Sequence, residues 1–131
     1  MDRAVTIREK VSQFENHRYP EGVAWLLCGD RVLASLERAS TRQERLKGLL
    51  NRDTCDGAML LERTRSVHTL GMRFAIDVAH CDASLKVLRT TTMRPNRIGC
   101  YVRKAQSVLE APAGSFERWG IEPGVELEVK E

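Results

Sequence analysis

Short apolar stretches separated by turn residues make up most of this chain. From residue 22 onward, clusters of apolar and β-branched residues stand between Gly, Pro, Asn and Asp, a pattern that favours short strands over long helices. Gly29 and Asp30 mark the turn of one hairpin, and residues 82–84 mark the turn of another. We expect strands at residues 23–27, 32–36, 58–61, 66–70, 74–81, 85–91, 107–111 and 125–129.

Two short helices interrupt these strands. Ser40 and Thr41 stand before Gln43 and Glu44 in a capping-box pattern, in which side chains satisfy the free backbone donors at a helix start, so we expect a helix from there to about Leu50. A second helix should follow Pro112 and end at Gly120, because glycine is favoured just beyond a helix C-terminus. The pattern predicts a mainly β fold with two short helices (α+β), whose antiparallel strands form a small sandwich or open barrel. Nothing alternates regularly enough to predict parallel βαβ units.

The first 21 residues follow a different pattern. Ile7, Val11 and Phe14 have helical spacing, and Pro20 ends it. We therefore expect residues 1–21 to form an appended helix or arm, and residues 22–131 to form one compact β-rich domain. The length of 131 residues suits a single domain of this kind.

Composition argues against several classes of protein. Apolar residues make up 42% of the chain and charged residues 30%, which is ordinary for a globular domain and argues against disorder. No apolar run approaches the roughly 20 residues that span a bilayer, and acidic residues near the start argue against a secretory signal. The cysteines lack C-x-x-C spacing, so we expect small buried side chains rather than disulfides or a metal site. We predict a cytoplasmic protein without a metal or cofactor. The four cysteines are Cys28, Cys55, Cys81 and Cys100.

Asp77 is the first candidate for chemistry, because strand alternation places its carboxylate between Ala75 and Ala79. Such a carboxylate either accepts backbone hydrogen bonds from a neighbouring loop, which is the commoner case, or belongs to a ligand site. His68 and Thr69 precede Gly71, where the chain can kink and present both side chains. A kink there could bring His68 to Asp77, which is half of a general-base arrangement, although the spacing assigns no nucleophile.

Basic residues are concentrated in one part of the chain and outnumber its acids. The net charge of +3 hides this local excess, because no acid lies between Asp82 and Glu110. A polar loop around Arg97 can bring guanidinium groups to a phosphate or carboxylate, and Arg45 on the first predicted helix is a second candidate for the same role. More often such a run is a solvated face. The basic residues of this stretch are Lys86, Arg89, Arg94, Arg97, Arg103 and Lys104.

Several segments in fixed order resemble the domain-of-unknown-function family 192. These are residues 44–50 (ERLKGLL), 58–61 (AMLL), 67–78 (VHTLGMRFAIDV), 108–114 (VLEAPAG) and 119–124 (WGIEPG). The resemblance covers about residues 22–129 and implies a compact, mainly β domain of prokaryotes without assigned catalytic residues or cofactor. This chain departs from the family pattern where His68–Met72 replaces an aromatic-Met-Lys-Asn-Thr run, and where Val125 replaces a common Asp.

Three functions follow from these residues. The first is a binding or accessory module, more a binder than an enzyme, that recognises a small anionic ligand or a protein partner. Its predicted ligand-binding residues are His68, Thr69, Asp77, Arg45 and Arg97. The alternative is a hydrolase that uses His68 as base and Asp77 to orient it. The third is nucleic-acid binding through residues 86–104, which is disfavoured because Tyr101 is the one aromatic residue nearby. The sequence predicts no membrane association and leaves the oligomeric state open.

Overall fold

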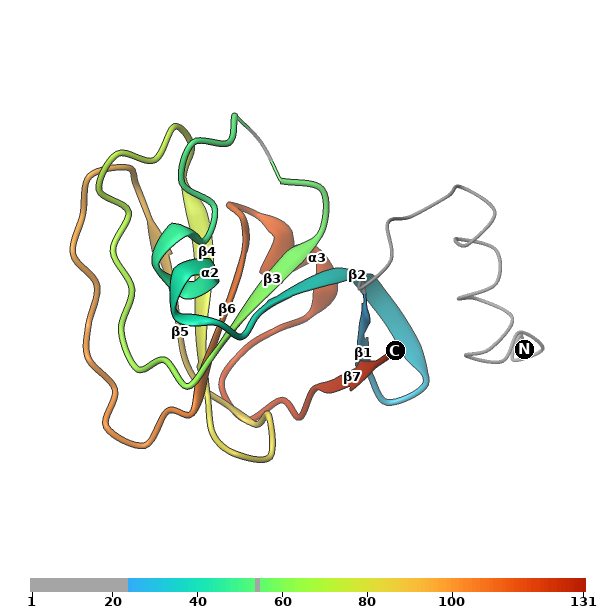
Figure 1. The fold of residues 1–131 in the computed structure, drawn as a ribbon. Helices are drawn as coiled ribbons and strands as arrows, with labels where there is room; N and C mark the ends of the chain where they lie inside the picture. The colour runs from blue at the N-terminus through green and yellow to red at the C-terminus, as the bar shows by residue number, and fades with distance from the viewer. Residues whose placement is uncertain (1–23, 54) are drawn as a thin grey trace.

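A computed structural model describes residues 24–53 and 55–131 of the chain (Figure 1). The predicted N-terminal helix or arm at residues 1–21 lies outside these described residues. No helix within the described part is both long and apolar enough to cross a membrane. The elements are β1 (Ala24–Cys28), β2 (Arg31–Ala39), α2 (Arg42–Lys47), β3 (Ala58–Glu62), β4 (Ile76–Cys81), β5 (Val87–Met93), β6 (Ser107–Pro112), α3 (Ser115–Trp119) and β7 (Glu128–Lys130).

The seven strands form one mixed sheet in the order β5-β4-β6-β3-β2-β1-β7. All neighbours are antiparallel except β2 and β3, which are parallel. The backbones of Lys86 and Glu126 form an isolated antiparallel β-bridge, which brings the two edges of the sheet toward each other. The sheet nevertheless does not close. The predicted class, mainly β with two short helices and mostly antiparallel strands, is confirmed, and the predicted sandwich or open barrel is in this structure a single sheet that does not close.

Two details differ from the predictions. The chain from β2 through α2 to the parallel strand β3 is a βαβ connection, which the irregular pattern of the sequence did not predict. Residues 66–70 were predicted as a strand, but they contribute only an isolated bridge from His68 to Ile98. Thr69 explains this second difference, because its buried hydroxyl and backbone bind the loop at 94–97 instead of a neighbouring strand.

The sheet carries a hydrophobic cluster on each face. One cluster contains Leu60 and Leu109 and is covered by Phe116 of α3. The other contains Leu61 and Val108 and is covered by Leu49, which follows α2. These residues come from alternate positions of the same strands, as expected when side chains point to opposite faces. The two helices therefore lie on opposite sides of the sheet (Figure 1).

Gly57 allows β3 to pack beside β2 in the parallel register. Its φ is +113°, and a Cβ atom at this position would lie 2.5 Å from the Ser35 Oγ and 2.6 Å from the Ser35 carbonyl oxygen. The register that follows pairs Leu36 with Ala58. A side chain at residue 57 would therefore push apart the strands that the βαβ connection joins.

We predict that Gly57→Ala destabilises the protein more than Gly29→Ala. Gly29 also has a positive φ of +63°, but a Cβ there would meet nothing within 4 Å, so the matched variant carries backbone strain without a clash. The expected extra loss for Gly57→Ala is about 1–3 kcal/mol in the free energy of unfolding, measured by urea denaturation. Equal losses in the two variants would contradict the close approach.

Candidate functional site

A cavity of about 590 Å³ opens on the face of the sheet that α2 covers. Its floor is formed by Leu61 of β3 and Glu110 of β6. One wall is α2 with residues 48–50, and another is the segment 63–68 that follows β3. We call this space the Glu110 cavity. Its remaining lining comes from Leu70, Met72 and Tyr101.

Glu110 is a buried carboxyl group without a partner. Its side chain points to the same face as Val108, and the residue pairs with Met59 and Val78 in the flanking strands. Glu110 is 3% exposed, and its carboxyl forms no hydrogen bond or ion pair with any described residue, although its backbone belongs to the sheet. Burial raises the pKa of Glu110 to about 7, because desolvation penalises the ionised form. Buried polar groups are normally satisfied, so this one is the strongest sign of a functional site.

The end of α2 shapes the wall next to Glu110. The predicted capping box is confirmed: the Glu44 backbone N–H donates to the Thr41 Oγ1 at 3.1 Å, and the Thr41 N–H donates to the Glu44 Oε1 at 3.0 Å. Hydrogen bonds from the backbone N–H groups of Thr41 and Ser40 hold the pKa of Glu44 below its usual value. Gly48 then ends the helix, and a Cβ atom there would lie 3.6 Å from the Glu110 Oε1. The short helix thus brings its C-terminal turn directly against the buried carboxyl.

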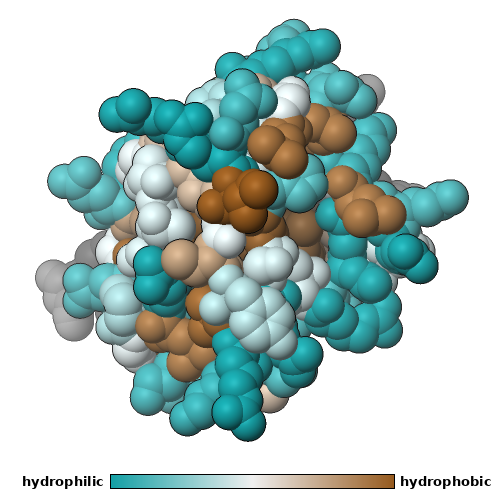
Figure 2. Space-filling model, turned by 90° about the vertical axis from the view of Figure 1, so that its left-hand side faces the viewer, coloured by the Kyte–Doolittle hydropathy of each residue, from teal (hydrophilic) through white to brown (hydrophobic). Residues whose placement is uncertain are grey.

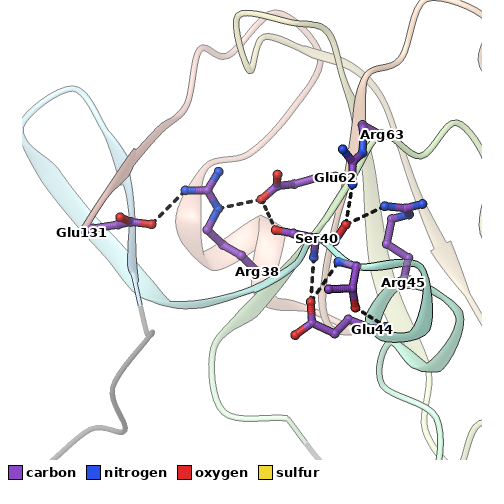
Figure 3. Close-up of polar contacts among 8 residues, drawn as sticks. Arg38, Ser40, Glu44, Arg45, Glu62, Arg63 and Glu131 are labelled. Carbon is purple, nitrogen blue, oxygen red and sulfur yellow. Dashed lines mark hydrogen bonds and ion pairs between the residues drawn. The ribbon is translucent and has the colours of Figure 1, made fainter.

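Ser40 holds two arginines at the cavity (Figure 3). Its carbonyl oxygen accepts from the Arg45 Nη1 at 2.7 Å and from the Arg63 Nη2 at 2.6 Å. Its hydroxyl donates to the Glu62 Oε2 at 2.8 Å, so the residue is tied to β3 as well as to α2. Arg63 has a positive φ of +52°, an uncommon conformation for a residue with a side chain. Two guanidinium groups therefore converge on one oxygen atom, and neither forms an ion pair with a described carboxylate.

The lining of the cavity is strongly basic and partly apolar. Glu110 is the one acid among the residues that line it, against five basic side chains. Leu46 and Tyr101, which are 66% and 65% exposed, add apolar surface at its edge. Figure 2 shows hydrophobic side chains among hydrophilic ones on one face of the molecule. The basic side chains of the lining are Arg42, Arg45, Lys47, Arg63 and Arg65.

The structure places two of the predicted site residues, His68 and Arg45, in the Glu110 cavity. His68 is exposed, and its Nδ1 accepts a hydrogen bond from the Leu70 N–H at 3.2 Å. A neutral His68 therefore carries its proton on Nε2, where it can act as a donor. Thr69 is fully buried and bonds the loop at 94–97, so its contacts position the kink.

Asp77 and Arg97 lie elsewhere. The Asp77 Oδ2 accepts from the backbone N–H groups of Gly114 and Phe116, both at 3.0 Å, and its Oδ1 accepts from the Thr92 hydroxyl at 2.7 Å. These bonds fit the commoner of the two interpretations, a carboxylate that holds a neighbouring loop. Asp77 shares the sheet face that α3 covers, and His68 lines the cavity on the other face, so the structure does not bring them together. Arg97 is exposed and lines a separate, shallower hollow.

Cysteine and metal chemistry add little to the site. All four cysteines are free, and Cys55 and Cys81 are buried as predicted, whereas Cys28 is only partly buried and Cys100 is exposed because it lies in the loop between β5 and β6. Burial raises the pKa of Cys55 to about 11 and that of Cys81 to about 12, which keeps both thiols protonated and unreactive. Within residues 24–53 and 55–131, no three His, Cys, Asp or Glu side chains gather in a way that could hold a metal ion.

Comparison with known proteins defines the class of this one. The chain matches the model of the DUF192 family, described as "Uncharacterized ACR", over residues 27–129. It therefore belongs to this family, as the sequence motifs predicted. Over 63 residues it is 38% identical to the UPF0127 protein PF1050 of Pyrococcus furiosus. That stretch is 48% of this chain and 54% of the relative, so the chain spans about half the length of the curated relative that it matches.

Two solved structures share the fold. A protein of unknown function from Novosphingobium aromaticivorans superposes with a TM-score of 0.68 at 19% identity, covering 81% of this chain and 83% of that one. A proposed transcription regulator from Sinorhizobium meliloti gives a TM-score of 0.70 at 21% identity, covering 82% and 92%. At these identities the likeness concerns the fold alone.

Glu110 and Arg63 are the site residues that the sequence did not single out. The signal for Glu110 was present, because Val108-Leu109-Glu110-Ala111 places one carboxylate in an otherwise apolar strand, as in the argument for Asp77. Strand periodicity assigns such a residue to a face, but it does not tell a bonded carboxylate from an unbonded one. Arg63 carries no comparable signal, because its role depends on a contact with Ser40 across 23 residues.

We predict that Glu110→Gln stabilises the protein at alkaline pH. The folded-state pKa of Glu110 is raised from 4.5 to about 7. The contribution of the protonated carboxyl to the free energy of unfolding is therefore fully present below pH 4.5 and is lost as the pH rises through 7. The loss is about 3 kcal/mol in the free energy of unfolding, and a neutral glutamine of similar shape avoids it. Urea denaturation at pH 5 and pH 8 tests this, since the advantage of the variant should grow with pH.

Asp77→Asn serves as the control for this experiment. Asp77 is as buried as Glu110, but its oxygens accept three hydrogen bonds, so the amide should destabilise the protein by about 1–3 kcal/mol. An advantage of Glu110→Gln that is the same at both pH values would show that the Glu110 carboxyl titrates normally.

Proposed function

We propose that this protein is a small binding module that takes up a small anionic ligand in the Glu110 cavity. The single observation that carries the proposal is the pair Arg45 and Arg63, whose guanidinium groups meet on the Ser40 carbonyl oxygen at 2.7 and 2.6 Å. Like charges held this close repel each other, and an anion placed between them would offset the repulsion. Guanidinium groups also have spare donors in the fork geometry that suits carboxylate and phosphate.

The surroundings of the arginine pair support the same proposal. Arg42, Lys47 and Arg65 line the same cavity and raise its positive potential, which attracts anions from solution. The volume of about 590 Å³ lies in the range of small-molecule sites. Ser40 is fixed by Glu44 and Glu62, so the arginines are held in place before a ligand arrives. A site prepared in this way needs little reorganisation on binding.

The cytoplasm remains the proposed location of this module. All four cysteines are free, which agrees with a reducing compartment.

Binding of inorganic phosphate and of short carboxylates tests the proposal by isothermal titration calorimetry. We predict that Arg45→Gln and Arg63→Gln each weaken binding about tenfold, because each removes charge-assisted hydrogen bonds to the anion. The affinity of the unchanged protein should also fall as salt is added, because its charges are partly exposed to solvent.

Arg97→Gln is the matched control, since Arg97 is an exposed arginine outside the cavity and was a candidate from the sequence. It should leave the affinity unchanged. A loss in Arg97→Gln as large as in the other two variants, or no anion binding at all, would remove the Glu110 cavity as the binding site. Thermal unfolding of each variant checks that it is folded.

A further inference from the structure

The Glu110 cavity holds side chains of opposite charge in different parts of its lining. Glu110 lies on the floor, and Arg45 and Arg63 lie where the wall of α2 meets the segment after β3. From this arrangement we infer that the ligand is a small zwitterion, whose ammonium group contacts Glu110 and whose carboxylate or phosphate contacts the two arginines. The inference rests on the proposed function, and it adds a cationic group to the anionic ligand proposed there.

The unpartnered carboxyl of Glu110 is the main support for an ammonium group. Asp77, on the neighbouring strand β4, has nearly the same exposure, 4% against 3%, and uses its oxygens to accept three hydrogen bonds. Glu110 accepts none from the described residues and faces the cavity. Its oxygens are therefore available to a donor group that enters from the cavity.

A charge on Glu110 favours an ammonium over a hydroxyl group. A hydroxyl donor would be accepted equally well by a glutamine, which carries no desolvation penalty for an ionised form. A cation gains more than a neutral donor from an ionised carboxyl at short range in a buried site. Opposite charges in the lining also fix the orientation of a zwitterion, because the reversed pose would place like charges together.

The other charged groups that line the cavity are cationic, and none of them pairs with Glu110. Arg45 and Arg63 are engaged with Ser40, and the Arg65 Nε donates to the Ala105 carbonyl oxygen at 3.2 Å. The other titratable groups of the cavity or near it are Arg42, Lys47, His68, Tyr101 and Cys55.

Part of the cavity lining is apolar. Leu49, Leu61 and Met72 line the cavity and are almost fully buried. A short aliphatic linker between the ammonium and the anionic group would pack against these side chains and exclude water from Glu110. The inferred class is therefore an amino acid or amino phosphate with its two charges at opposite ends of a short carbon chain.

Pairs of probes that differ only in the amine test the inference by calorimetry at pH 7. The zwitterions are γ-aminobutyrate, ε-aminocaproate and phosphoethanolamine, and their partners are butyrate, caproate and ethyl phosphate. We expect at least one zwitterion to bind about tenfold more tightly than its partner. Because burial raises the pKa of Glu110 to about 7, an ammonium should also displace the proton from this carboxyl. Titrations in two buffers of different ionisation enthalpy measure that release.

Glu110→Gln should abolish both the amine preference and the proton release, and it should leave the affinity for the plain anions nearly unchanged. Glu117→Gln, which removes an exposed acid on α3 outside the cavity, should change neither. Equal affinity for both members of every pair would overturn the inference that the ligand is a zwitterion. An amine preference that survives in Glu110→Gln would overturn it as well. Either result would leave the proposed anion site intact. Failure of every probe to bind would overturn the proposed function itself.

Discussion

The parallel pairing of β2 with β3 is the constraint on which the candidate site depends. Parallel neighbours cannot be joined by a tight turn, so the chain between them has to cross one face of the sheet. In this protein α2 makes that crossing and brings Arg45 and Gly48 over the strands. Gly57 permits the close approach of the two strands, and Ser40 fixes the crossing by bonding Glu62 of β3. The cavity is the space that this connection and the segment after β3 enclose.

Glu110 then acquires its properties from its place in the sheet. It lies on β6, between β3 and β4, so its carboxyl is buried and its neighbours in register are apolar. An apolar residue or an amide would fill the same position without the free-energy cost of burying an ionised carboxylate. Residues that destabilise the fold in this way are expected mainly at functional sites. One feature, a carboxyl that the fold leaves without a hydrogen-bond partner, underlies two expectations. It explains the loss of folding stability as Glu110 ionises, and it explains the proposed contact with a cationic group.

The sequence predicted the local features of the fold and missed the long-range ones. The hairpin turn at Gly29, the capping box at Thr41 and the helix end at Gly120 depend on residues a few positions apart, and all are found. The strand expected at residues 66–70 failed, because Thr69 bonds a loop more than 20 residues away. For the site, Arg45 and His68 were predicted and line the cavity, whereas Arg63 and Glu110 depend on contacts or packing that no local pattern encodes.

The state of Glu110 is the central claim, and a carbon-13 NMR titration of its side-chain carboxyl tests it most directly. Glutamate labelled at Cδ reports each carboxyl separately, and Glu110→Gln identifies the resonance. We predict a midpoint near pH 7 for Glu110, well above the usual 4.5, in the protein without ligand. A midpoint near 4.5 would show that the carboxyl is solvated or paired, and it would contradict this account of the site.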